Sequence, residues 1–133
     1  MSDSLDTCVI LAYAIGEPID QRDAAWDLLG SGAEHYVADL ALTEAAYVLE
    51  DHYRHSRKEV VYLLRKFLEQ NNKVLNYNRA LFDLVFPFYE AHPALSFNDC
   101  CLAAYAELVH AEPLFTFDRK LARQHPSAKM LQV

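Results

Sequence analysis

The stretch Leu114-Phe-Thr-Phe-Asp-Arg-Lys-Leu121 joins an apolar run, an acidic residue and the start of a helical pattern. Residues 114–117 suit a buried strand, and residues 119–124 have the spacing of a short helix. Asp118 stands at the junction, where it could cap the helix or project from the end of the strand. A strand that leads directly into a helix is the repeating unit of α/β folds.

The same alternation of strand and helix patterns runs through the rest of the chain. Other apolar runs that suit strands are residues 4–6, 35–37, 73–75 and 129–132. Segments with helical periodicity are residues 20–29, 40–55, 59–70, 80–91 and 97–110. Asp39 and Ser96 are expected to cap two of these helices, and Ser56 with Glu59 forms a capping-box pattern. The order predicts a three-layer α/β/α domain with a mainly parallel sheet of four or five strands.

Length and composition limit the function classes. A chain of 133 residues with 53% apolar residues fits one compact domain, residues 1–133. The 12 Lys and Arg against 19 Asp and Glu give a net charge of -7, which argues against a broad electrostatic grip on nucleic acid. The three cysteines have no zinc-ligand spacing, and no stretch is long enough to cross a bilayer. A reduced cytoplasmic location without membrane contact is expected.

Asp6 and Glu44 are acidic residues beside apolar runs. Asp6 ends the strand pattern 4–6, where it could be a site residue or the N-cap of the next helix. Glu44 shares a helical face with Leu40, Tyr47 and Val48, so it is expected to turn toward the core. The alternative for Glu44 is an exposed position at the edge of that face.

Asp99 repeats the pattern near the start of another helix. Its neighbours on the same helical face are Leu95, Leu102, Ala103 and Ala106. Ser96 and Asp99 also resemble a capping box in which Asp takes the usual place of Glu. A residue in a first helical turn can both cap and coordinate, so the two interpretations are compatible.

The four acids together indicate a metal site. Two at strand ends and two on helices could meet at the edge of a parallel sheet where ligands collect. At about 4 Å, two carboxylates repel by roughly 4 kcal/mol at an effective dielectric constant near 20, so a cation is needed to hold them together. Oxygen ligands without paired His or Cys favour Mg²⁺ or Mn²⁺, which suit phosphodiester hydrolysis.

Four motifs, in order, carry a resemblance to a known family. They are residues 4–11 (SLDTCVIL), 42–46 (LTEAA), 97–104 (FNDCCLAA) and 114–121 (LFTFDRKL). The chain resembles the PIN-domain ribonucleases, most closely the VapC-type toxins of toxin-antitoxin pairs. The resemblance implies that the metal-binding and catalytic residues are Asp6, Glu44, Asp99 and Asp118.

The resemblance also implies partners and supporting residues. The hydroxyls of Thr7 and Thr116 would orient ligands or water. The family has RNA as substrate, forms homodimers, and binds an antitoxin whose tail lies across an apolar groove and sends a basic side chain into the acidic site. Cys8 departs from the Asn that is common in the family, and the pair at 100–101 replaces small or aliphatic residues.

Basic residues lie in two regions of the chain. Arg119, Lys120 and Arg123 follow Asp118 and are candidates to contact RNA phosphates. The second region comprises Arg54, Arg57, Lys58, Arg65 and Lys66.

Two other functions are consistent with parts of this pattern. A PIN-like scaffold without activity could bind protein or RNA only. An aspartate-based phosphotransferase would need Asp-x-Asp-x-Thr, but Cys8 stands two residues after Asp6.

Overall fold

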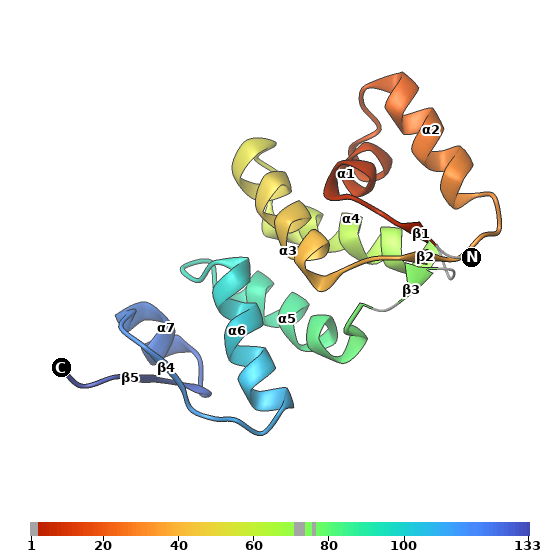
Figure 1. The fold of residues 1–133 in the computed structure, drawn as a ribbon. Coiled ribbons are helices and arrows are strands. Elements are labelled where there is room, and N and C mark those ends of the chain that lie inside the picture. The colour runs from red at the N-terminus through yellow and green to blue at the C-terminus, as the bar shows by residue number, and fades with distance from the viewer. Residues whose placement is uncertain (1–2, 71–73, 76) are drawn as a thin grey trace. The chain divides into compact units, whose positions relative to one another are not determined.

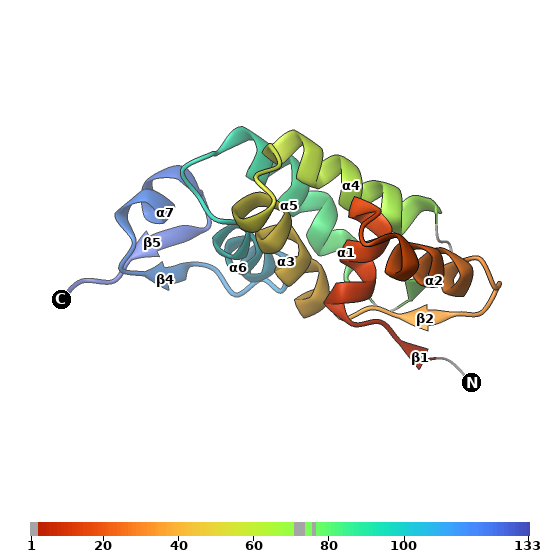
Figure 2. The same ribbon diagram turned by 90° about the horizontal axis from the view of Figure 1, so that it is seen from above.

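The protein divides into two compact units, Met1–Tyr77 and Asn78–Val133. The structure, a computed structural model, describes residues 3–70, 74–75 and 77–133. Helices dominate, and the described strands are two or three residues long (Figures 1 and 2). The α/β class and the parallel strand pairing are confirmed, but the strands form a three-stranded and a two-stranded sheet, one in each unit, where one sheet was expected.

The first unit is built on the sheet β1-β2-β3, comprising β1 (Asp3–Ser4), β2 (His35–Tyr36) and β3 (Val74–Leu75). Both strand pairs are parallel. Helix α1 (Thr7–Ile15) follows β1 and helix α3 (Asp39–Tyr47) follows β2. Because these strands point the same way, both helices start from the same edge of the sheet.

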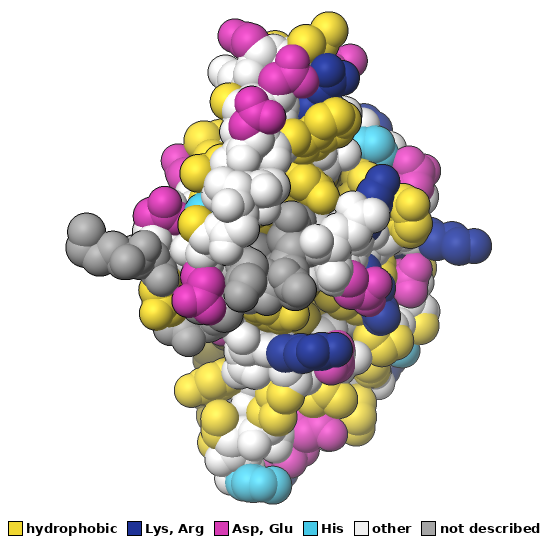
Figure 3. Space-filling model, turned by 90° about the vertical axis from the view of Figure 1, so that its right-hand side faces the viewer, with side chains coloured by type: hydrophobic (Ala, Val, Ile, Leu, Met, Phe, Trp, Pro, Cys, Tyr) yellow, Lys and Arg dark blue, Asp and Glu magenta, His cyan; other side chains and the backbone are white. Residues whose placement is uncertain are grey.

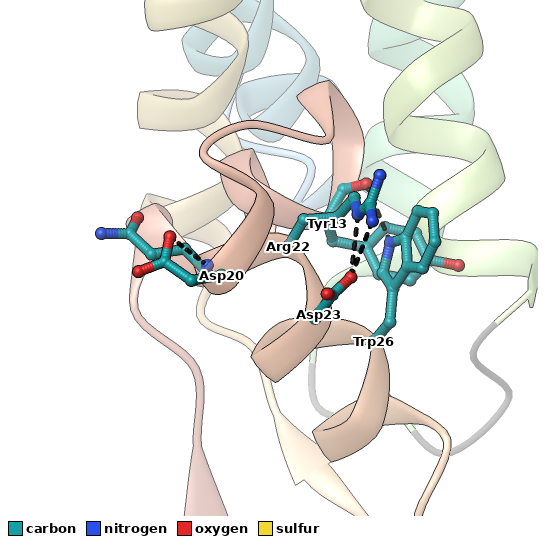
Figure 4. A network of polar contacts seen from close by, with 6 residues as sticks. Tyr13, Asp20, Arg22, Asp23 and Trp26 are labelled. Atoms are coloured by element: carbon teal, nitrogen blue, oxygen red, sulfur yellow. Dashed lines mark hydrogen bonds and ion pairs between the residues drawn. The ribbon is translucent and has the colours of Figure 1, made fainter.

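Helices α1 and α2 (Ile19–Leu29) pack together in this unit. Helix α1 ends at Gly16, whose φ of 81° is readily available to glycine, and its N–H donates to the carbonyl of Ala12. Figure 4 shows the contact between the helices: Trp26 Nε1 donates to the carbonyl oxygen of Tyr13 at 3.4 Å. Arg22 covers the Trp26 ring at 4.6 Å and pairs with Asp23.

The helix expected over residues 40–55 has two parts in the structure. Helix α3 continues into a π-helical turn, η1 (Val48–His52). Asp39 is the first residue of α3, and Ala38 takes the N-cap position, so the predicted cap at Asp39 is wrong.

Helix α4 (Arg57–Gln70) begins two residues before its predicted start at Glu59. The expected capping box is present, because Ser56 Oγ accepts from the Glu59 N–H at 3.2 Å and donates to the Glu59 carboxylate. The helix buries one strongly apolar face that comprises Val60, Val61, Leu64, Phe67 and Leu68.

The second unit contains α5 (Arg79–Ala91), α6 (Phe97–Leu108), β4 (Leu114–Thr116), α7 (Arg119–Gln124) and β5 (Ala128–Met130). Helices α5 and α6 pack through aromatic rings: the ring centroid of Phe97 lies 6.2 Å from Phe82, 6.1 Å from Phe86 and 5.0 Å from Tyr89. Strands β4 and β5 are parallel and are joined through α7. Among the described residues, no helix has the length and apolar character that a membrane span requires.

The surface keeps many hydrophobic side chains. Figure 3 shows one face on which they alternate with acidic and basic groups. Trp26, Leu40, Tyr47 and Tyr62 are among the large hydrophobic residues that are exposed.

Candidate metal centre

Asp6 directly follows β1 and takes the N-cap position of α1, with extended backbone angles. Its carboxylate makes no capping hydrogen bond to the helix. The side chain is exposed, and Oδ2 accepts a weak hydrogen bond from Cys8 Sγ at 3.4 Å. The N-cap alternative therefore holds for the backbone of Asp6, while its carboxylate remains available as a ligand.

The two residues that follow Asp6 differ in exposure: Cys8 is exposed and Thr7 is buried. Cys8 is exposed, and its hydrogen bond to Asp6, its partial desolvation and the nearby Asp6 charge raise its pKa above the ordinary 9.0. Thr7 is buried at the first position of α1. The thiol thus lies beside Asp6, at the position where the resemblance implies an Asn side chain.

We expect the thiol of Cys8 to react slowly with a chromogenic disulfide reagent in metal-free buffer, because its thiolate forms only above the ordinary pH range. Asp6→Asn removes the acceptor charge, so the pH at which Cys8 becomes reactive should fall. The measurement is the reaction rate as a function of pH, with Cys8→Ser as the control, since Cys100 and Cys101 are buried. Unchanged pH dependence in Asp6→Asn would contradict the contact.

Glu44 lies on α3, which packs against α1. Its predicted inward orientation is wrong, because Glu44 is exposed together with Leu40 and Tyr47. The buried face of α3 consists instead of Ala41, Leu42, Ala45 and Ala46. Three small alanines permit close helix packing, and this outweighs the larger residues that the periodicity had favoured.

Asp99 stands in the first turn of α6 and is half-buried. Its N–H donates to Ser96 Oγ at 3.1 Å, so the predicted cap at Ser96 is confirmed. The carboxylate of Asp99 has no hydrogen-bond or ion-pair partner among the described residues. Of the residues predicted to share an apolar helical face with Asp99, Leu95 and Ala103 are buried, whereas Leu102 is exposed.

We expect Ser96→Ala to lower the free energy of unfolding by about 1 kcal/mol, because it leaves an N–H at the start of α6 without its acceptor. Chemical denaturation measures the change. Ser96→Asp keeps an acceptor at the N-cap and should recover most of the loss. A Ser96→Ala variant as stable as the wild type would contradict the capping role.

Asp118 follows β4 and caps α7. Its Oδ1 accepts from the N–H groups of Lys120 at 2.9 Å and Leu121 at 3.2 Å. Thr116 Oγ1 accepts from the Asp118 N–H at 2.9 Å, which fixes the turn between β4 and α7. The capping alternative for Asp118 is therefore confirmed. Both of these capping hydrogen bonds use Oδ1, so Oδ2 is the oxygen proposed to bind a cation.

The four acids are divided equally between the two units. Asp6 and Glu44 belong to the first unit, and Asp99 and Asp118 belong to the second. Within the part of the chain that the structure describes, no group of three or more His, Cys, Asp or Glu residues forms a metal-ligand cluster. The convergence of all four acids stays a prediction.

The chemistry of the available donors suits a hard cation. Asp6, Glu44 and Asp99 have no Lys or Arg partner within the described ranges 3–70, 74–75 and 77–133. Carboxylate oxygens that are exposed or half-buried and not neutralised by a protein cation are the ligands that Mg²⁺ and Mn²⁺ prefer. In the second unit, α7 carries three exposed basic residues, Arg119, Lys120 and Arg123.

Asp39 is a further acidic residue near a strand end, which the sequence patterns predicted only as a helix cap. It follows β2 much as Asp6 follows β1, and it is half-buried at the start of α3. Because β1 and β2 are parallel neighbours, both acids follow the same edge of the first sheet. The available signal was its position after the strand pattern 35–37, but the helical pattern that starts at Leu40 favoured an N-cap at Asp39.

Comparison with known families gives one match that covers most of the chain. The profile described as PIN domain matches residues 4–125, which includes all four acids and extends across both units. The comparison with curated proteins found no match. The chain therefore belongs to the PIN-domain family, whose members are generally nucleases.

Proposed function

We propose that this protein is a metal-dependent endoribonuclease that hydrolyses phosphodiester bonds of RNA with a metal-activated water. The observation that carries the proposal is the PIN-domain match over residues 4–125 together with the four acids inside it. Three of these acids have no basic partner in the described residues, as a cation site requires. The proposal treats residues 1–133 as a single domain in which both units contribute ligands.

Each residue has a proposed role. Asp6, Glu44, Asp99 and Asp118 would hold Mg²⁺ or Mn²⁺, which, when bound, activates water and neutralises charge on the phosphoryl group. Thr116 Oγ1 accepts from the N–H of Asp118, and the buried Thr7, next to Asp6 in the chain, is proposed to help to orient ligands or water. The exposed Arg119, Lys120 and Arg123 are proposed to contact RNA phosphates.

Purified protein is expected to degrade single-stranded RNA in the presence of Mg²⁺ or Mn²⁺. The degradation should stop when a chelator is added. Activity should return when the divalent ion is restored in excess. The measurement is the appearance of fragments on a denaturing gel, with single-stranded DNA of the same sequence in parallel. RNA binding without fragments in any divalent ion would favour the scaffold function, and cleavage that persists in chelator would contradict metal dependence.

We also propose that the protein is the toxin of a type II toxin-antitoxin pair. Support comes from an apolar hollow of about 350 Å³ between α1 and α2, lined by Cys8, Val9 and Ala12 on one side and Ala24, Ala25 and Leu28 on the other. Cys8 is two residues from Asp6, so an extended tail in this hollow would pass near the acid. The three free cysteines agree with a reducing, cytoplasmic location.

The partner proposal is tested by co-purification with the product of the neighbouring small reading frame. A complex that blocks RNA cleavage is expected, and Ala24→Arg at an exposed position on the wall of the hollow should weaken it. An inhibitor that binds Ala24→Arg as tightly as wild type would exclude this hollow. Sedimentation of the protein alone measures whether it forms the expected homodimer.

A further inference from the structure

One of the two basic regions of this acidic chain lies in the segment 54–66. Residues 54–66 contain five of the 12 Lys and Arg residues and a single acid, Glu59, although the whole chain has a net charge of -7. The segment comprises the loop after η1 and most of α4. Such clustering on one element is typical of a local contact with an anion rather than of general solubility.

Two of these charges, Lys58 and Lys66, flank an aromatic ring on the outer face of α4, whereas Arg57 pairs with Glu50 at 3.1 Å. Lys58, Tyr62 and Lys66 are spaced by four residues, so they form one stripe on the helix, and all three are exposed. Tyr62 is 61% exposed, although most of the other apolar residues of α4 are buried. Over eight residues the stripe extends about 12 Å along the helix.

The single acid of the segment is engaged elsewhere. Glu59 is bound at the start of α4, where its carboxylate accepts from Ser56 Oγ at 3.0 Å and contacts His55 Nδ1 at 2.8 Å. The hydrogen bonds from His55 and Ser56 lower the pKa of Glu59. Lys58 and Lys66, by contrast, have no ion-pair partner in the described part of the chain.

A shallow hollow lies along the same face. Its volume is about 300 Å³, and it is lined by Tyr62, Arg65, Lys66, Glu69 and Gln70. An aromatic ring beside two cations offers a stacking surface for a base and charges for the adjoining phosphates. Gln70 and Glu69 add hydrogen-bonding groups for the edge of a base.

We propose that the outer face of α4, formed by Lys58, Tyr62 and Lys66 with Arg65, is a binding surface for single-stranded RNA. The inference rests on the proposed ribonuclease function and adds a substrate contact that is separate from the four acids. Helix α4 packs against both α1 and α3, so RNA on its outer face is held by the unit that contains Asp6 and Glu44. Single-stranded RNA is favoured over an acidic protein because the exposed tyrosine between two lysines suits a base between two phosphates.

The test measures binding of a fluorescein-labelled single-stranded RNA of mixed sequence by anisotropy, in chelator so that cleavage does not interfere. Tyr62→Ala is expected to weaken binding by about 5-fold to 100-fold, from the loss of stacking, and Tyr62→Phe should retain most of it. Lys58→Gln/Lys66→Gln should reduce the slope of log affinity against log salt by about 1.4, because each phosphate contact to a single strand contributes about 0.7.

The matched control is Arg79→Gln/Lys129→Gln, which removes the same charge from exposed positions in the second unit. Circular dichroism confirms that each variant is folded. The inference is overturned if Lys58→Gln/Lys66→Gln has the affinity and salt slope of the wild type. It is also overturned if the two changes in this variant are no larger than those in the control. If wild type binds and cleaves RNA while these variants do so equally well, the proposed function stands and only this surface fails. Wild type that neither binds nor cleaves RNA refutes the proposed function itself.

Discussion

Asp6→Asn is expected to lower the rate of RNA cleavage by at least about 100-fold, and Asp99→Asn should have a similar effect. Each replacement removes the negative charge of a proposed metal ligand. The cation is expected to contribute several kcal/mol to the stabilisation of charge in the transition state, where each 1.4 kcal/mol is tenfold in rate. The double variant should be little worse than either single variant, because residues that hold one ion act as a unit. Initial rates with a labelled RNA measure all three.

The controls for these variants are Asp27→Asn in the first unit and Asp83→Asn in the second, both exposed and outside the four motifs. They make the same change in charge and should retain nearly full activity. Effects of Asp6→Asn and Asp99→Asn that simply multiply would indicate two independent sites. Full activity in either variant would remove that residue from the proposed site.

Phe97→Ala is expected to lower the free energy of unfolding by about 3–5 kcal/mol, a large share of the stability of a typical domain. Phe97 is buried at the start of α6, and its ring contacts the rings of Phe82, Phe86 and Tyr89 on α5. Removing the ring leaves a cavity and loses contacts to three aromatic neighbours. Urea denaturation, followed by circular dichroism, measures the change.

The control on the same helix is Leu102→Ala, because Leu102 is 55% exposed and its truncation should change stability by no more than about 0.5 kcal/mol. Phe97 is two residues from Asp99, so Phe97→Ala should also reduce RNA cleavage where the protein is still folded. Equal stability of the Phe97 and Leu102 variants would show that the aromatic cluster does not hold α6 in place.

Much of the local structure could be predicted from the sequence because it depends on short-range chemistry. The caps at Ser56 and Ser96 and the turn at Asp118 involve residues two or three positions apart, and the structure has all three. The strand positions were predicted to within a few residues for the same reason. The π-helical turn at Val48–His52 was not predicted, since the apolar periodicity of the sequence continues through it.

The candidate site was harder to predict because it depends on packing. Glu44 shares its helical face with Leu40 and Tyr47, which favours burial by periodicity alone, but alanines form the packed face of α3. Apolar periodicity does not tell which of two faces is packed when one carries large side chains and the other carries alanines that permit close helix contact. The four acids were found by their motifs, and the PIN-domain match spans all of them.

The most direct test of the metal site is a calorimetric titration of Mn²⁺ and Mg²⁺ into the wild type and into two variants, one for each unit. Binding by the wild type is expected, and both Asp6→Asn and Asp118→Asn should weaken it strongly, because the proposed site uses both carboxylates as ligands. Asp27→Asn should bind as the wild type does. Equal binding by the wild type, Asp6→Asn and Asp118→Asn would contradict the proposed metal site.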